Sequence, residues 1–210
     1  MTTSTKRPLC PRCTKPLRAC ICAFVRVLDN ATEVLILQHS DEIHHPKNSA
    51  GLLHLCLKQS RLWQGDVLDE AQLKAVLSEG NKQAILLYPA LENDAQLAAT
   101  QLVQCDEKLD VSRLRLVVLD ATWRKSRLML IQNPLLQSLP RLALSDVPES
   151  QYVIRNAHQA HQLSTLEATT YALMALEKTS VKPNDYSVLL QSFAELNAQQ
   201  IGFGVLNKVR

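Results

Sequence analysis

Residues 114–127 read LRLVVLDATWRKSR, and this stretch indicates the fold class. Its first seven residues, Leu114–Asp120, are mostly apolar and partly β-branched, which is typical of a strand buried on both faces of a parallel sheet. A polar turn follows, and a helix is predicted from Thr122 onwards. A buried strand that leads through a polar turn into a helix is the repeating unit of an α/β protein.

The same alternation continues on both sides of this stretch. VLILQH (residues 34–39) and AILLYP (residues 84–89) are also short apolar runs and predict buried parallel strands. Helices are predicted at residues 49–59, 69–78, 94–104, 122–131, 165–178 and 185–199. Ser164 followed by Glu167 fits a capping box at the start of one of them. We therefore expect an α/β fold with a mostly parallel sheet and helices on both faces.

The amino-terminal segment differs from the rest of the chain in composition and periodicity. Residues 8–22, PLCPRCTKPLRACIC, contain four cysteines and no helix or strand period. Their spacing is Cys-x2-Cys, six residues, and Cys-x-Cys, at Cys10, Cys13, Cys20 and Cys22. Four such ligands can complete a tetrahedral shell around zinc, and a closed shell is structural and not catalytic. We therefore predict a structural zinc segment at residues 1–30 and a main domain at residues 31–210.

Two other interpretations of the four cysteines are less favourable. Two disulfides are disfavoured in a reducing compartment, and a redox-active Cys-x2-Cys pair normally lies beside a βαβ unit. Cys56 and Cys105 lie in apolar, helix-like surroundings, so we expect them to be small buried side chains and not ligands.

Composition excludes several classes of protein. Hydrophobic residues make up 46% and charged residues 20%, which is ordinary for a globular domain. No apolar run reaches the roughly 18 residues of a membrane span, and the start of the chain lacks the apolar region of a secretory signal. We therefore expect a cytoplasmic protein with no membrane segment. The chain has only five glycines and no Gly-rich phosphate loop or Gly-x-Ser-x-Gly elbow, which disfavours dinucleotide dehydrogenases, P-loop NTPases and α/β-hydrolases.

Charge is concentrated at the amino terminus. The net charge is +3, but residues 1–30 carry six basic residues against one acidic residue. This local excess predicts a mildly basic face that could contact nucleic acid or could only keep the protein soluble.

Polar clusters follow each predicted strand. They are residues 39–49 (HSDEIHHPKNS), Tyr88-Pro89, and residues 120–123 (DATW). Ligands of open α/β sheets bind beyond the carboxyl ends of the strands, so the three clusters could share one crevice. Each has a structural alternative: Asp120 could cap the following helix, and Trp123 could be a core anchor. The residues alone indicate a ligand-binding α/β domain with basic patches.

Five ordered landmarks, together with the four cysteines, resemble the DTW-domain family. Residues 120–123 match its Asp-x-Thr-Trp signature, and the others are LQHSDE (residues 37–42), Asn48-Ser49, Tyr88-Pro89 and STLEA (residues 164–168). The chain looks like the bacterial tRNA-uridine aminocarboxypropyltransferases of that family. The resemblance implies transfer of the 3-amino-3-carboxypropyl group of S-adenosylmethionine to N3 of a tRNA uridine, with release of methylthioadenosine. It also implies a SPOUT-like fold with a carboxy-terminal trefoil knot.

The resemblance also suggests roles for individual residues. Asp120, Thr122 and Trp123 would be catalytic, with Asp120 accepting the N3 proton directly or through water. The S-adenosylmethionine pocket would be formed by Tyr88, Pro89, Leu142, Leu163, Ser164 and Thr165. The phosphates of tRNA would contact Arg124, Lys125, Arg127 and Arg155. For Trp123 we expect core packing ahead of stacking on the target base.

Two other functions would fit the same features. A SPOUT-like RNA methyltransferase would use the same cofactor but transfer its methyl group. A zinc-stabilised RNA-binding factor would have no catalytic activity at all.

Overall fold

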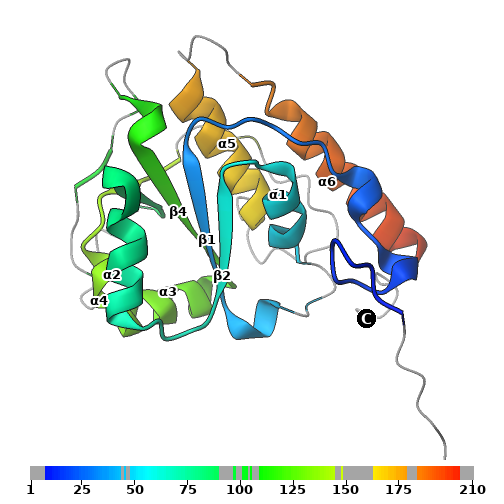
Figure 1. Ribbon diagram of the computed structural model, residues 1–210, viewed down its shortest axis with the longest axis horizontal. Helices are drawn as coiled ribbons and strands as arrows, with labels where there is room; N and C mark the ends of the chain where they lie inside the picture. Colours follow the sequence, from blue (N-terminus) through cyan, green and yellow to red (C-terminus); the bar gives the residue numbers. More distant parts are fainter. Residues whose placement is uncertain are drawn as a thin grey trace, which may run out of the picture.

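The computed structural model describes residues 8–43, 45, 48–89, 97, 101–103, 105, 109–144, 148, 163–178 and 184–203. Within these residues, five parallel strands form one sheet in the order β2-β1-β4-β3-β5 (Figure 1). The strands are β1 (Glu33–Gln38), β2 (Ser60–Gln64), β3 (Gln83–Leu87), β4 (Leu114–Asp120) and β5 (Arg141–Leu142). The helices are α1 (Ala50–Cys56), α2 (Glu70–Ser78), α3 (Trp123–Gln132), α4 (Pro134–Gln137), α5 (Thr165–Glu177) and α6 (Ser187–Gly202).

Helices cover both faces of the sheet, as predicted (Figure 1). On one face, α1, α5 and α6 pack against Val34 and Ile36 of β1, whereas α2, α3 and α4 pack against Leu35 and Leu37 on the other. Successive residues of a strand point to opposite faces, so a strand covered on both sides is mostly apolar. β1 and β4 are buried along their whole length, which explains the apolar residues at the centre of both strands.

The strand order creates a switch point between β1 and β4. These strands are neighbours, but the chain leaves β1 towards β2 on one side and leaves β4 towards β5 on the other. Loops that diverge in this way leave a crevice at the carboxyl ends of the two strands, where ligands of open α/β sheets bind. Gln38 and Asp120, the last residues of β1 and β4, are paired across it.

The N-cap side chains of α3 and α5 cap these two helices at this edge of the sheet. The N-cap of α3 is Thr122, whose side chain accepts a hydrogen bond from Lys125 N. The N-cap of α5 is Ser164, which forms the predicted capping box with Glu167. Because Thr122 takes the capping position, the alternative in which Asp120 caps the helix is wrong.

Several predicted boundaries need correction. The helix predicted at 49–59 ends at Cys56, because the chain turns there into β2, which was not predicted. The helix predicted at 94–104 lies largely outside the described residues, and its predicted end is wrong because Leu102 pairs with Arg141 of β5. Cys56 is fully buried, as expected, and Cys105 packs partly buried against the same core.

The 3-10 helices are short turns at the borders of these elements. They are η1 (Leu17–Ala19), η2 (Cys22–Phe24), η3 (Ser40–Glu42), η4 (Glu79–Asn81) and η5 (Val111–Arg113). None of the helices in the described part of the chain has the length and hydropathy needed to cross a membrane.

Candidate functional site

Asp120 is the centre of a buried polar network at the end of β4. Only 5% of its surface is exposed. Its Oδ2 accepts hydrogen bonds from Gln38 Nε2 at 2.9 Å and from Asn48 Nδ2 at 2.5 Å, and its Oδ1 accepts one from Thr165 Oγ1 at 2.7 Å. The three donors come from β1, from the turn before α1, and from the first residue of α5. Buried carboxylates need such donors, because an unsatisfied charge would be very unfavourable there.

The backbone ties the same corner together. His39 N donates to Asp120 O at 3.0 Å, and Asn48 Oδ1 accepts from Gly51 N in the first turn of α1 at 3.2 Å. Asn48 therefore joins the start of α1 to the Asp120 carboxylate. This geometry gives a structural reason for the Asn48 landmark, which lies in the polar cluster predicted at residues 39–49.

A second polar group lies beside the first, at the turn after β1. Asp66 accepts hydrogen bonds from Ser40 N at 2.7 Å and Ser40 Oγ at 2.8 Å, and the first of these lowers the pKa of its carboxyl group. Lys125 Nζ lies 2.7 Å from Asp41 Oδ2, and its hydrogen bond and charge lower the pKa of Asp41. Lys125, predicted to contact phosphate, is therefore already paired with a carboxylate.

Tyr88 and Trp123 form an aromatic pair on the other side of Asp120. Their ring centroids lie 5.7 Å apart at 66°, an edge-to-face arrangement. Tyr88 is buried and its hydroxyl lies 3.2 Å from Ser126 Oγ in α3. Trp123, in contrast, is 47% exposed, so the expectation of a core position for it is wrong. Trp123 is the first residue of α3, and about half of its surface is accessible even though its ring contacts Tyr88.

The residues predicted for the cofactor pocket lie at the same edge of the sheet. Tyr88 N donates to Leu142 O at 3.1 Å, which joins the ends of β3 and β5. Thr165 contacts Asp120 directly. Ser164 is engaged at the start of α5: its N–H donates to Glu167 Oε2, its hydroxyl oxygen accepts from Glu167 N, and its carbonyl accepts from Ala168 N.

The structure thus brings Asp120, Asn48 and Thr165 into direct contact, and it adds residues that sequence reasoning missed. Gln38 lies within the LQHSDE landmark but received no role, and Gln64 and Asp66 belong to the unpredicted β2 and the turn after it. A polar residue ending an apolar strand was the available signal for Gln38.

The residues predicted to contact RNA differ in their exposure. Arg124 is exposed, Arg127 is half-buried, and Arg155 lies outside the described residues.

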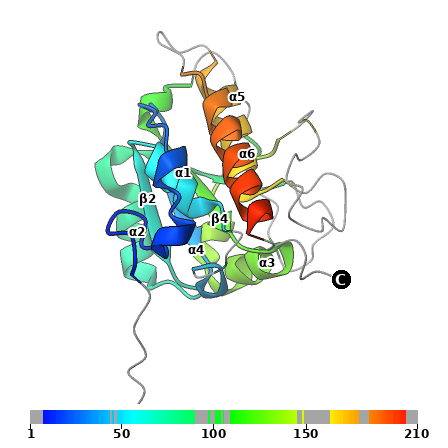
Figure 2. The same cartoon turned by 90° about the vertical axis from the view of Figure 1, so that its right-hand side faces the viewer.

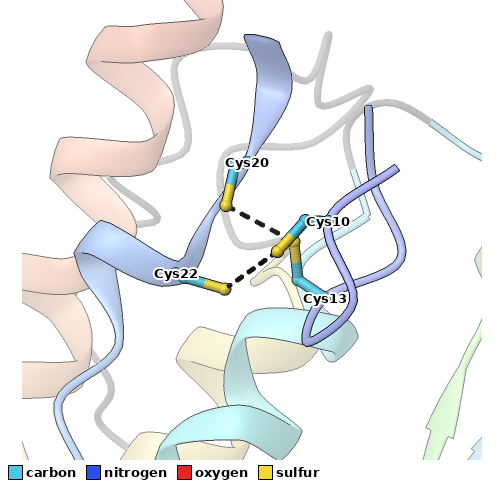
Figure 3. A group of neighbouring side chains, drawn as sticks. All are labelled: Cys10, Cys13, Cys20 and Cys22. Atoms are coloured by element: carbon cyan, nitrogen blue, oxygen red, sulfur yellow. Dashed lines mark hydrogen bonds between the residues drawn. The ribbon is translucent and has the colours of Figure 1, made fainter. Parts of the chain in front are cut away.

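The four cysteines form a separate cluster at the amino terminus (Figure 3). Cys10 and Cys22 have their sulfur atoms 3.7 Å apart, as do Cys13 and Cys20, and all four sulfurs lie within 4.8 Å of one another. A tetrahedral zinc–thiolate shell requires sulfur separations of about 3.8 Å, since each Zn–S bond is about 2.3 Å. All four are free thiols, so the cluster fits a metal ion better than two disulfides.

Local backbone geometry prepares this cluster for a cation. Cys10 N donates to Lys15 O at 2.8 Å, which closes a tight turn that carries Cys10 and Cys13. Backbone N–H groups of Cys13 and Arg12 lower the pKa of Cys10 to about 6, whereas desolvation and the neighbouring thiols raise the pKa of Cys22 to about 12. A bound dication would favour the thiolate form of every ligand.

The cysteine cluster is attached to α6. Arg26 Nη2 donates to both carboxylate oxygens of Glu195, at 2.8 and 2.9 Å, and Arg26 Nη1 donates to Ser192 Oγ at 3.0 Å. Gln199 Nε2 reaches Cys20 O at 3.5 Å. Figure 2 shows the amino-terminal segment running beside α6, which itself lies against α5.

Comparisons with known proteins identify the family of this chain. The family model described as "DTW domain" matches residues 7–201. Two curated relatives named tRNA-uridine aminocarboxypropyltransferase 2, from Mus musculus and Macaca fascicularis, are each 29% identical over 180 residues. The match covers 83% of this chain but only 58% of each relative. No solved structure gives a significant match. Since the family model spans nearly the whole chain, including both polar sites, the protein belongs to the DTW-domain family.

Proposed function

We propose that this protein transfers the 3-amino-3-carboxypropyl group of S-adenosylmethionine to N3 of a tRNA uridine. The observation that carries the proposal is the Asp120 carboxylate, held by three donors at the switch point of the sheet. Membership of the DTW-domain family and the names of the two relatives support this reaction class.

The uridine N3 carries a proton and is a poor nucleophile until that proton is lost. Among the described residues, Asp120 Oδ1 accepts from one donor, Thr165, and Oδ2 accepts from two, so we assign Oδ1 as the oxygen that would accept the N3 proton. The nitrogen then forms a bond to the propyl carbon as the bond from that carbon to sulfur breaks, and methylthioadenosine leaves. When bound, S-adenosylmethionine supplies the activated carbon beside its sulfonium group.

The remaining residues of this edge would bind and orient. S-adenosylmethionine would be held by residues at the ends of β3 and β5 and at the start of α5. These residues are Tyr88, Pro89, Leu142, Leu163, Ser164 and Thr165. Thr122 supports the position of Asp120 by capping α3. Trp123 offers the exposed part of its ring as a stacking platform for the extruded uracil.

Contacts with the tRNA backbone complete the proposal. Arg124 is exposed beside the site, and Arg127 and Arg155, with the basic residues of the zinc segment, would bind phosphates. Lys125 would do so only by exchanging Asp41 for a phosphate.

We also propose that residues 1–30 bind one structural zinc ion. Residues 31–210 would form a SPOUT-like catalytic domain with a carboxy-terminal knot, and the protein would act in the cytoplasm.

The test is incubation of undermodified tRNA with the protein and S-adenosylmethionine, followed by mass spectrometry of the nucleosides. We expect uridine to gain the mass of the aminocarboxypropyl group and methylthioadenosine to be released. The Asp120→Asn variant keeps the shape but loses the base, so its rate should fall by about 10²- to 10⁴-fold.

Other products of this incubation would contradict the proposed reaction. A gain of 14 mass units would identify a methyltransferase, and the absence of any product would favour a non-catalytic RNA-binding factor. Full activity of Asp120→Asn would remove Asp120 from the role of proton acceptor. Unchanged binding of S-adenosylmethionine by Asp120→Asn in calorimetry is the control for folding.

A further inference from the structure

Three neighbouring strands end in polar residues that form one row across the sheet. Gln64 of β2 is paired with Gln38 of β1, and Gln38 is paired with Asp120 of β4. Their side chains are joined in the same order: Gln64 Nε2 donates to Gln38 Oε1 at 2.9 Å, and Gln38 Nε2 donates to Asp120 Oδ2 at 2.9 Å. The row begins at the exposed Gln64 and ends at the buried Asp120.

The charge of Asp120 determines which atoms of Gln38 and Gln64 donate and which accept in this row of hydrogen bonds. An ionised carboxylate only accepts hydrogen bonds, so Gln38 must turn its NH₂ group towards Asp120. The carbonyl of Gln38 then faces Gln64, which must present its own NH₂ group. If the amide of Gln38 rotated by half a turn, its carbonyl oxygen would face the carboxylate and repel it. Gln64 therefore stabilises the one orientation of Gln38 that supports Asp120.

We propose that Gln38 and Gln64 are positioning residues that hold Oδ2 of Asp120 in place and so aim Oδ1 at the substrate. Gln38 is 2% exposed, so no water replaces its hydrogen bond to the carboxylate. Together with Asn48, which donates to the same oxygen, it fixes the rotation of the carboxyl group about its last bond. A base that is fixed in this way needs no reorientation when the substrate binds. This inference rests on the proposed role of Asp120.

The first test is the near-isosteric Gln38→Met variant, which removes the donor and keeps the volume. We expect kcat to fall by about 10- to 100-fold, which corresponds to the loss of one hydrogen bond to a charged group, while KM for tRNA and for S-adenosylmethionine stays unchanged. Gln64→Met acts only through Gln38, so we expect a drop in kcat of less than about tenfold. In the double variant the Gln64→Met effect should disappear, because it has no amide left to orient.

The second test is the pH dependence of Gln38→Glu. This variant places a second carboxyl group beside Asp120, and two carboxyl groups in one site share a proton to higher pH. The acid limb of the kcat profile should therefore move upwards by about one pH unit or more, with activity recovering as the pH rises. The matched control is Gln83→Glu, the same substitution at the opposite end of the sheet on β3, which should leave the profile unchanged.

These variants separate the inference from the proposed function. If Asp120→Asn is inactive but Gln38→Met and Gln38→Glu behave like the unmodified protein, the hydrogen bonds of the two glutamines do not contribute to catalysis and the inference is wrong. If Asp120→Asn is fully active, the proposed base itself is wrong. Gln64 is exposed, so Gln64→Met provides a test that does not disturb the core.

Discussion

The two polar sites of this protein are built in opposite ways. All four sulfurs of the cysteine cluster come from one short segment, between Cys10 and Cys22. The partners of Asp120 lie 82, 72 and 45 residues away along the chain, at Gln38, Asn48 and Thr165. The first site is therefore determined by the spacing of cysteines within one segment, and the second is determined by the order of the strands in the sheet.

This difference predicts how each site fails. The cysteine segment has turns and two short 3-10 helices; Ile21 is buried in the main core and Arg26 binds Glu195 of α6, and the proposed zinc ion would add the link between the two pairs of cysteines. The Asp120 network is held by the sheet, whose core residues lie on both faces. Loss of the metal should therefore dismantle the first site and leave the second intact.

The largest expected effect in this comparison comes from removing the metal. Chelation, or the Cys13→Ala variant, should unfold residues 8–28 and lower the free energy of unfolding by about 4 kcal/mol or more, the range seen for loss of a structural metal. Hydrogen exchange followed by mass spectrometry should show loss of protection in that segment and in the part of α6 that contacts it, with β1 and β4 still protected.

Cys105→Ala is the matched control, because this cysteine lies outside the cluster. It should keep one zinc per chain by elemental analysis. Equal loss of protection in β1 and in the cysteine segment after chelation would contradict the separation of the two sites. A chain purified without zinc that nevertheless protects residues 8–28 would contradict the metal assignment.

The same contrast explains how much the sequence could predict. The cysteine spacing specified a complete ligand set, because four thiols within 13 residues leave few arrangements other than a closed shell. The strands β1, β3 and β4 were predicted because burial on both faces requires continuous apolar runs. The edge strand β2, SRLWQ, could not be predicted because each of its residues is half-buried or exposed and three of the five are polar.

The Asp120 network could be predicted only in part for the same reason. That Asp120 lies at the end of a strand follows from the sequence, but Gln38 and Gln64 become its neighbours only through the β2-β1-β4 order. Nothing in a single strand states which strand lies beside it. Trp123 was misjudged because its exposure depends on where α3 begins, one residue after the Thr122 cap.

A smaller effect is expected where the cysteine segment meets α6. Arg26→Ala removes the two-bond contact with Glu195 and the bond to Ser192, and we expect a loss of about 1 kcal/mol because both charged side chains are about one-third exposed. The control is Lys58→Ala, which breaks the single, more exposed contact with Asp29 and should change the free energy of unfolding by less than about 0.5 kcal/mol. Equal values for the two variants in urea titrations would mean that Arg26 adds nothing to the attachment.

The smallest expected effect concerns one backbone angle in the cysteine segment. Thr14 follows Cys13 and has a φ of 56°, a left-handed conformation that is strained for a β-branched residue. Thr14→Gly relieves roughly 1–2 kcal/mol of strain but gives the unfolded chain more freedom, so the net gain should be about 0.5 kcal/mol. If the proposed zinc ion orders the segment and so imposes this angle, the gain should disappear after chelation.

Asn81→Gly is the informative partner of this variant. Asn81 also has a positive φ, 51°, but it lies in η4 before β3, where the sheet and not the metal holds the backbone. Its gain should be similar or smaller, because asparagine tolerates this conformation, and it should survive chelation. If thermal unfolding shows that both gains depend on the metal, or that neither does, the two regions are not stabilised independently, since the same local strain would then report on one shared folding unit.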